Sequence, residues 1–291
     1  MEIAVSSWSL HRHLPMAGTR RDESGVKHFG RLEPAEEPIS IMDFPRIIKE
    51  RYGISKVEVC QMHVLSQEQE YLAELKEALQ EAGVGVVNMP IDVGNISLEN
   101  PDWRAEDIAE IKTWIDVAEY LGSPCVRVNS GHPSGVVFGP ADLGEFDLSV
   151  TIASYKELAA YCQAKGMTLL LENHWGISAD PQNIIKLVEG VASPAFKLCP
   201  DFGNFDEEVR YKGLEMMFPY AAMVHAKTYD FNEAGEQDRF DFGRCMEIMK
   251  ASGYDGPISI EFEGEKGDAY EGIALTKALI ERYLHLTPPD S

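Results

Sequence analysis

The chain has 291 residues, and 44% of them are hydrophobic, which is enough to bury a sizeable core. Its 48 aspartates and glutamates outnumber its 26 lysines and arginines, so the formal net charge of −22 argues against a nucleic acid partner. No apolar run approaches the length of a membrane span and no secretion signal is visible, which predicts a cytoplasmic protein with no membrane partner. Five scattered cysteines without a C-x-x-C pair indicate reduced thiols.

Apolar, β-rich segments alternate with amphipathic helical segments along the whole chain. The predicted strands lie at residues 2–9, 56–61, 85–91, 125–131, 167–174, 196–204, 223–231 and 257–264. Predicted helices between them include residues 66–83, 104–122, 155–166 and 240–253, each ending in a glycine suited to a left-handed cap. This alternation, without a break in composition, predicts an α/β protein in which residues 1–291 form a single (β/α)8 TIM barrel.

A long connection follows the first predicted strand, at about residues 11–38. It is rich in glycine, proline and mixed charge. Long loops at the functional face of a barrel are usually lids or subunit contacts, so assembly into a homo-oligomer stays open.

Polar residues lie where several of the predicted strands end, and in a TIM barrel these ends form the functional face. In chain order they are Trp8, His63, Asn88 or Asp92, Asn129 with His132, Glu172 with His174, Asp201 with Asn204, His225 with Lys227, and Glu261 with Glu263.

Four of these residues fall at matching places on the last four predicted strands: Glu172, Asp201, His225 and Glu261. Three carboxylates around one imidazole would repel strongly without a cation among them, so the set predicts a divalent metal site. Taken singly, each residue has a commoner explanation. These are a salt bridge for Glu172, a hydrogen-bonded core histidine for His225, turn chemistry for Asp201 and an edge carboxylate for Glu261.

The same segments carry a resemblance to a known family. "LLLENHW" at 169–175, "CPDFGNF" at 199–205, "VHAKTYDF" at 224–231 and "GYDGPISIEFEG" at 253–264 resemble the xylose-isomerase-like TIM barrels of the sugar phosphate isomerase/epimerase superfamily. The resemblance covers essentially the whole barrel, and its specific part is the C-terminal half. It implies that the four residues bind one divalent ion, usually Mn²⁺, Mg²⁺ or Co²⁺, with Zn²⁺ as a further candidate.

The resemblance also implies a sugar isomerase or epimerase. A divalent ion would stabilise the enediolate that forms when a proton is removed next to a carbonyl. Glu172 and Glu261 are then the expected catalytic groups, since two carboxylates facing each other across a sugar can remove a proton from one face and return one to the other. Delivery of the proton to the neighbouring carbon would be isomerisation.

Two departures from the family pattern leave the substrate open. Many epimerases of the family have a histidine where this chain has Asn204, and an arginine shortly after the metal-binding histidine that is not evident here. Lys227 could donate to a substrate oxygen or pair with Asp230 or Glu263. Trp8 could stack on a sugar or plug the barrel. The expected substrate is a sugar or polyol ketone, and the predicted substrate-binding residues are Trp8, His63, His174, Asn204, Lys227 and Glu263.

Three alternative functions fit the same sequence less well. A lyase could use the same metal and base to dehydrate a keto-inositol or to cleave a keto-glycoside. An AP-endonuclease-like enzyme would need more metal-binding histidines and a cationic groove, which the charge of −22 opposes. A non-catalytic barrel that binds a sugar as a regulator is the third alternative.

Overall fold

The computed structural model describes residues 1–135 and 145–285, and eight parallel strands form its main sheet. They are β1 (Ile3–Ser6), β4 (Lys56–Glu58), β5 (Gly85–Ile91), β6 (Cys125–Val128), β7 (Thr168–Glu172), β8 (Phe196–Cys199), β9 (Val224–Thr228) and β10 (Ile258–Phe262). In the order β8-β7-β6-β5-β4-β1-β10-β9, strands that follow one another along the chain lie side by side, except β8 and β9, which stand at the two ends.

The sheet curls until its two ends meet. Parallel bridges join Leu198 to Ala221 and Asp201 to His225, so the region after β8 lies against β9. β1 pairs with both β4 and β10, which links the first strand to the last. The predicted α/β TIM-barrel fold is therefore confirmed.

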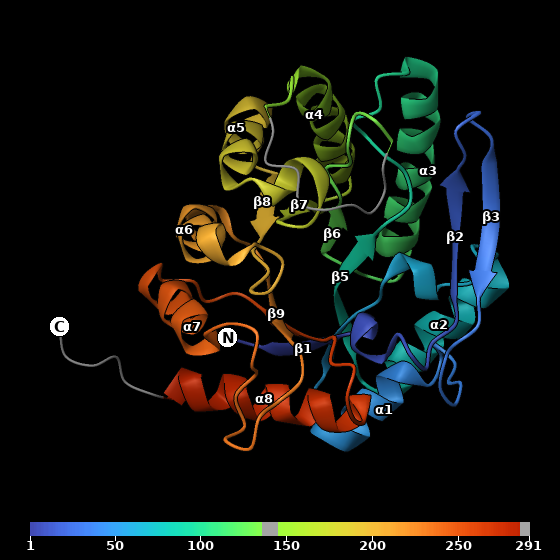
Figure 1. Cartoon of the computed structure of the whole chain (residues 1–291). Coiled ribbons are helices and arrows are strands. Elements are labelled where there is room, and N and C mark those ends of the chain that lie inside the picture. Colours follow the sequence, from blue (N-terminus) through green and yellow to red (C-terminus); the bar gives the residue numbers. More distant parts are fainter. Residues whose placement is uncertain (136–144, 286–291) are drawn as a thin grey trace.

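In the part of the chain that the structure describes, eight α-helices surround the strands (Figure 1). They are α1 (Phe44–Tyr52), α2 (Gln69–Glu81), α3 (Pro101–Tyr120), α4 (Ser149–Ala164), α5 (Pro181–Val191), α6 (Glu207–Met217), α7 (Phe242–Ala251) and α8 (Ala269–His285). α3 and α5 start for a local reason, because each has proline in its first turn after a side chain, Asn100 or Asp180, that accepts backbone N–H groups. Within the described residues, no helix combines the length and the apolar character needed to cross a membrane.

The observed strands are shorter than predicted where side chains turn the backbone. Residues 169–171 of β7 are fully buried, as expected for a strand covered on both faces. The first strand stops at Ser6, whose hydroxyl accepts the N–H of Trp8 and opens the short helix η1 (Ser7–Leu10). β8 stops at Cys199, two residues before a turn held by Asp201.

The long connection after η1 contains a β-hairpin that the sequence did not indicate. Its strands, β2 (Met16–Arg21) and β3 (Lys27–Leu32), stand beside α3 and outside the barrel (Figure 1). Arg21 and Lys27 each place a cationic atom 2.7 Å from Oδ1 of the buried Asp107 on α3. Gly25 has a φ of +90°, and a Cβ there would lie 2.2 Å from the Trp103 ring, so glycine is required for this close approach.

Candidate metal centre

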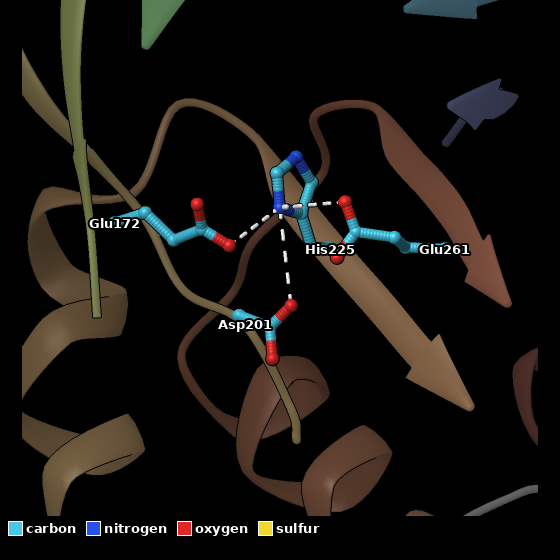
Figure 2. A group of neighbouring side chains, drawn as sticks. All are labelled: Glu172, Asp201, His225 and Glu261. Carbon is cyan, nitrogen blue, oxygen red and sulfur yellow. Dashed lines mark hydrogen bonds and ion pairs between the residues drawn. The ribbon is translucent and has the colours of Figure 1, made fainter. Parts of the chain in front are cut away.

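The structure brings Glu172, Asp201, His225 and Glu261 together inside the barrel. All four side chains are buried, and one ligand atom from each lies within 4.8 Å of the others. His225 Nδ1 lies 2.8 Å from Glu172 Oε1, 3.9 Å from Asp201 Oδ2 and 4.0 Å from Glu261 Oε1. Figure 2 shows Glu172 and Glu261 approaching this nitrogen from opposite sides, with Asp201 between them.

Asp201 combines turn chemistry with a place in the cluster. Its Oδ1 accepts the backbone N–H groups of Gly203 and Asn204, at 2.7 and 2.8 Å, which fixes the turn after β8. The side chain of Asn173 holds the Asp201 backbone through its N–H and its carbonyl. Asp201 Oδ2, by contrast, is buried and accepts no hydrogen bond from the residues that the structure describes. One oxygen shapes the loop, and the other remains for a cation.

Glu172 has the salt bridge that its burial required. Arg127 Nε lies 3.0 Å from Glu172 Oε2, and the same guanidinium donates to Asp92. Glu172 Oε1 faces His225 and also accepts a 3.1 Å hydrogen bond from Asn204 Nδ2. The salt bridge and the place in the cluster thus involve different oxygens. Sequence analysis missed Arg127, although a single arginine between two valines of the predicted strand at residues 125–131 was a usable signal.

A second missed residue, Glu58, lies on the other side of His225. Glu58 Oε2 is 3.0 Å from His225 Nε2 and accepts a 2.7 Å hydrogen bond from Asn88 Nδ2. A single glutamate within the predicted strand at residues 56–61 was the signal here. Burial alone would lower the pKa of His225, but the carboxylates of Glu58 and Glu172 raise it well above its usual value.

Lys227 lies among four polar side chains. Its Nζ is 2.9 Å from Glu261 Oε2, 3.1 Å from Glu263 Oε1 and 2.8 Å from Asn204 Oδ1, and Asp201 Oδ2 is 3.5 Å away. The expected ion pair with Glu263 is therefore present. Although burial lowers the pKa of this amine, the neighbouring carboxylates raise it well above its usual value, so Lys227 is charged.

Trp8 connects to this group through Glu263. Its indole Nε1 donates a 2.6 Å hydrogen bond to Glu263 Oε1, and its ring stacks on His11 at a centroid distance of 4.7 Å. The ring of His63 lies 6.2 Å from that of Trp8, and His63 Nδ1 is 2.8 Å from Ser7 Oγ. Burial lowers the pKa of His63 to about 3, so its imidazole is neutral at physiological pH.

His174 borders the cluster on the Arg127 side. Its Nδ1 is 3.2 Å from Asn129 Oδ1, and Asn129 in turn donates to Asp92. Burial lowers the pKa of His174 to about 4, although the negative charge of Glu172 acts to raise it. This ring is therefore also neutral at physiological pH. His174 therefore offers a neutral donor or acceptor at the edge of the centre.

The charges of the centre do not balance. Five carboxylates, those of Asp92, Glu172, Asp201, Glu261 and Glu263, share two permanently charged partners among the described residues, Arg127 and Lys227, and a sixth, that of Glu58, pairs with His225. Burial and the neighbouring carboxylates raise the pKa of Asp201 to about 8, although Lys227 opposes this. Burial likewise raises the pKa of Glu261. An oxygen-rich set with one imidazole fits a hard or borderline divalent ion, which would supply the missing positive charge.

Comparison with known proteins agrees with the fold. The family model described as xylose isomerase-like TIM barrel matches residues 48–280. A solved L-ribulose 3-epimerase is 17% identical with a TM-score of 0.73, over 98% of this chain and 95% of that one. A 3-keto-D-glucoside 4-epimerase from E. coli is 16% identical with a TM-score of 0.70, over 97% of this chain and 99% of that one.

A further neighbour was solved with a metal. It is a xylose isomerase-like TIM barrel protein from Mycobacterium smegmatis in complex with magnesium, 17% identical with a TM-score of 0.67, over 97% of this chain and 96% of that one. No curated protein matches the sequence significantly. At these identities the solved structures show a shared fold, and activity has to be argued from the site.

Proposed function

Because the chain belongs to the xylose isomerase-like TIM-barrel family, we propose that it is a divalent-metal-dependent sugar epimerase or isomerase. The observation that carries this proposal is the placement of two buried carboxylates, Glu172 and Glu261, on opposite sides of one imidazole nitrogen (Figure 2). Such a pair can serve the two faces of one substrate carbon.

The residues that would hold the ion are Glu172, Asp201, His225 and Glu261. When bound, a divalent ion supplies positive charge that makes the hydrogen next to a substrate carbonyl more acidic. Three carboxylates and one imidazole favour Mn²⁺, Mg²⁺ or Co²⁺. Structural zinc sites, by contrast, are typically rich in thiolate ligands.

The two glutamates are the proposed proton-transfer groups. In an epimerisation, one of them removes the proton from one face of the carbon, and the other supplies a proton to the opposite face. Arg127 and Asn204 hold Glu172, while Lys227 holds Glu261, so both carboxylates are fixed before substrate enters. Such prior orientation removes part of the entropy cost of reaching the transition state.

Charge also limits the proposed substrate. Arg127 is paired with Asp92 and Glu172, and Lys227 with Glu261 and Glu263, so neither cation is available to a phosphate without losing a carboxylate partner. A phosphorylated sugar would bring further negative charge into a centre that already has an excess. We therefore propose an uncharged sugar or polyol ketone, held by Asn204 and His174 and covered by the ring of Trp8.

A lyase is the second candidate, and the position of Lys227 favours it. An ammonium group 2.9 Å from Glu261 could protonate a leaving group expelled next to the carbon that loses its proton. The reacting groups would otherwise be the same as those of the epimerase.

The two candidates are separated by their products. Mn²⁺-loaded protein is incubated with a panel of ketohexoses and keto-inositols, and the products are resolved by chromatography and mass spectrometry. A sugar isomer of unchanged mass supports the epimerase or isomerase, and loss of water identifies the lyase. Absence of turnover across the panel by protein with bound Mn²⁺ would count against both. The Asp201→Ala variant, which removes one proposed ligand, is the control for contaminating activity.

A further inference from the structure

Glu58 is a fully buried carboxylate that the proposed chemistry does not use. It is the last residue of β4, and its side chain has no exposed surface. Within residues 1–135 and 145–285, Glu58 forms an ion pair with His225, and no lysine or arginine pairs with Glu58. Burying an ionised carboxylate is costly unless a hydrogen-bonded partner compensates, and His225 is the partner that does so.

The backbone places Asn88 to hold Glu58. The pairing of β4 with β5 shifts by one residue between Val57 and Glu58, and this irregularity brings Asn88 opposite Glu58. Asn88 Nδ2 then donates a 2.7 Å hydrogen bond to Glu58 Oε2, the same oxygen that lies 3.0 Å from His225 Nε2. Glu58 Oε1 has no hydrogen-bond partner among the described residues, so the hydrogen bonds of this carboxylate are made by one oxygen, Oε2.

The two ring nitrogens of His225 consequently have different surroundings. Nδ1 faces the three carboxylates of the candidate metal centre, while the other ring nitrogen points away from them (Figure 2). Donation of an Nε2 hydrogen to Glu58 leaves the Nδ1 lone pair directed into the centre. Carboxylates commonly orient metal-binding histidines in this way, through the nitrogen that does not touch the metal.

We propose that Glu58, supported by Asn88, is a positioning residue that holds His225 in the tautomer and orientation needed to bind a divalent ion through Nδ1. The inference rests on the proposed metal site. It adds two residues from strands that supply none of the four ligands, so the ligand set alone does not reveal them.

The test measures Mn²⁺ binding directly by electron paramagnetic resonance, with wild type and two Glu58 variants. Glu58→Gln keeps the size and one accepting oxygen but removes the charge, and we expect Mn²⁺ to bind roughly 10-fold more weakly. Glu58→Leu removes the acceptor as well, and the expected loss is on the order of 100-fold. Equal Mn²⁺ affinity in Glu58→Gln, Glu58→Leu and wild type would overturn the inference.

Asp107→Asn is the matched control, because Asp107 is a buried carboxylate that pairs with the hairpin outside the barrel. We expect its Mn²⁺ affinity to equal that of wild type. If Asp107→Asn lost as much Mn²⁺ affinity as Glu58→Gln, removal of any buried charge would have the same effect. That result would reject the positioning role of Glu58.

The second readout is the ring N–H signal of His225 in ¹⁵N-edited NMR spectra of protein saturated with diamagnetic Mg²⁺, in which Nδ1 carries no hydrogen; the signal is assigned by its loss in His225→Gln. The expected signal comes from Nε2–H, lies downfield in wild type, and moves upfield in Glu58→Gln because the acceptor is neutral. This readout remains decisive if Glu58→Leu does not fold, since an unchanged signal in Glu58→Gln contradicts the inference. Wild type that binds no Mn²⁺ would instead contradict the metal site of the proposed function.

Discussion

Asp201 shows at the scale of one residue how protons and a cation compete for the centre. Its pKa is raised to about 8 by burial and by the charges of Glu172 and Glu261, so below that pH the carboxyl holds a proton. His225 also has a raised pKa, despite its burial. A bound cation requires both groups without these protons.

Mn²⁺ affinity should therefore increase as pH rises from about 6 to 8. Each proton released on binding contributes up to about a tenfold change in the dissociation constant per pH unit. Calorimetric titrations at pH 7 in two buffers with different ionisation enthalpies count the protons released. An enthalpy that is the same in both buffers, with an affinity independent of pH, would contradict this prediction.

Asn204 bridges the two halves of the centre. It donates to Glu172 and accepts from Lys227, so its amide contacts one proposed reacting carboxylate directly and is linked to the other, Glu261, through Lys227. Asn204→Ala should raise the KM for the sugar roughly tenfold, the cost of about one hydrogen bond, while the protein still binds one Mn²⁺. Steady-state kinetics combined with metal analysis measure the two effects separately. Unchanged KM and kcat would remove Asn204 from the substrate site.

Glu172 and Glu261 should each be essential as bases. Glu172→Gln and Glu261→Gln preserve shape and one ligand oxygen but remove the basic carboxylate, so kcat should fall by at least about two orders of magnitude. Both variants must be saturated with Mn²⁺, since loss of metal alone would also slow the reaction. Variants that are fully metallated and turn over like wild type would exclude this role.

At the scale of elements, Arg127 links the turn after β5 to β7. It lies between Asp92 and Glu172, and its guanidinium is buried. Burial would raise the pKa of Asp92, but Arg127 lowers it, so the ionised carboxylate stabilises the fold above the unfolded pKa and this stability is lost as pH falls through the folded pKa.

Arg127→Met should lower the free energy of unfolding at pH 7 by about 3–5 kcal/mol, because two buried carboxylates lose their cation. The deficit should shrink in acid, where Asp92 and Glu172 become protonated. Urea denaturation of wild type and variant, at pH 7 and at acidic pH, measures the difference in the free energy of unfolding. Lys112→Met is the control, because it breaks a more exposed ion pair with Glu157 and should cost no more than about 1 kcal/mol. Similar losses in the two variants would refute the argument.

The strands and the polar residues at their ends were predictable because the barrel repeats one unit, so Glu172, Asp201, His225 and Glu261 recur at equivalent places. Glu58 and Arg127 were harder to predict, because a single charge in a strand does not reveal which partner it meets across the barrel. The hairpin after β1 escaped prediction for another reason. It packs on α3, and most of β3 is exposed, so its strands lack the apolar alternation that marks a buried face.

At the scale of the whole molecule, the charge of −22 and the excess of carboxylates in the centre favour the same partners: a divalent cation and an uncharged ligand. The fold follows from the alternation of strands and helices, which recurs eight times along the sequence. The choice of sugar does not follow from it, because related barrels differ in the loops and side chains that surround the same centre.

The central claim is that this centre moves a proton to and from a sugar carbon. Its most direct test is incubation of Mn²⁺-loaded wild type in D₂O with the ketose that it converts, followed by NMR and mass spectrometry of both sugars. The account predicts one solvent deuterium at the carbon that is inverted, or that receives the proton, with the mass otherwise unchanged. Interconversion of the sugars without solvent deuterium would contradict it, because the hydrogen would then have moved directly between carbons.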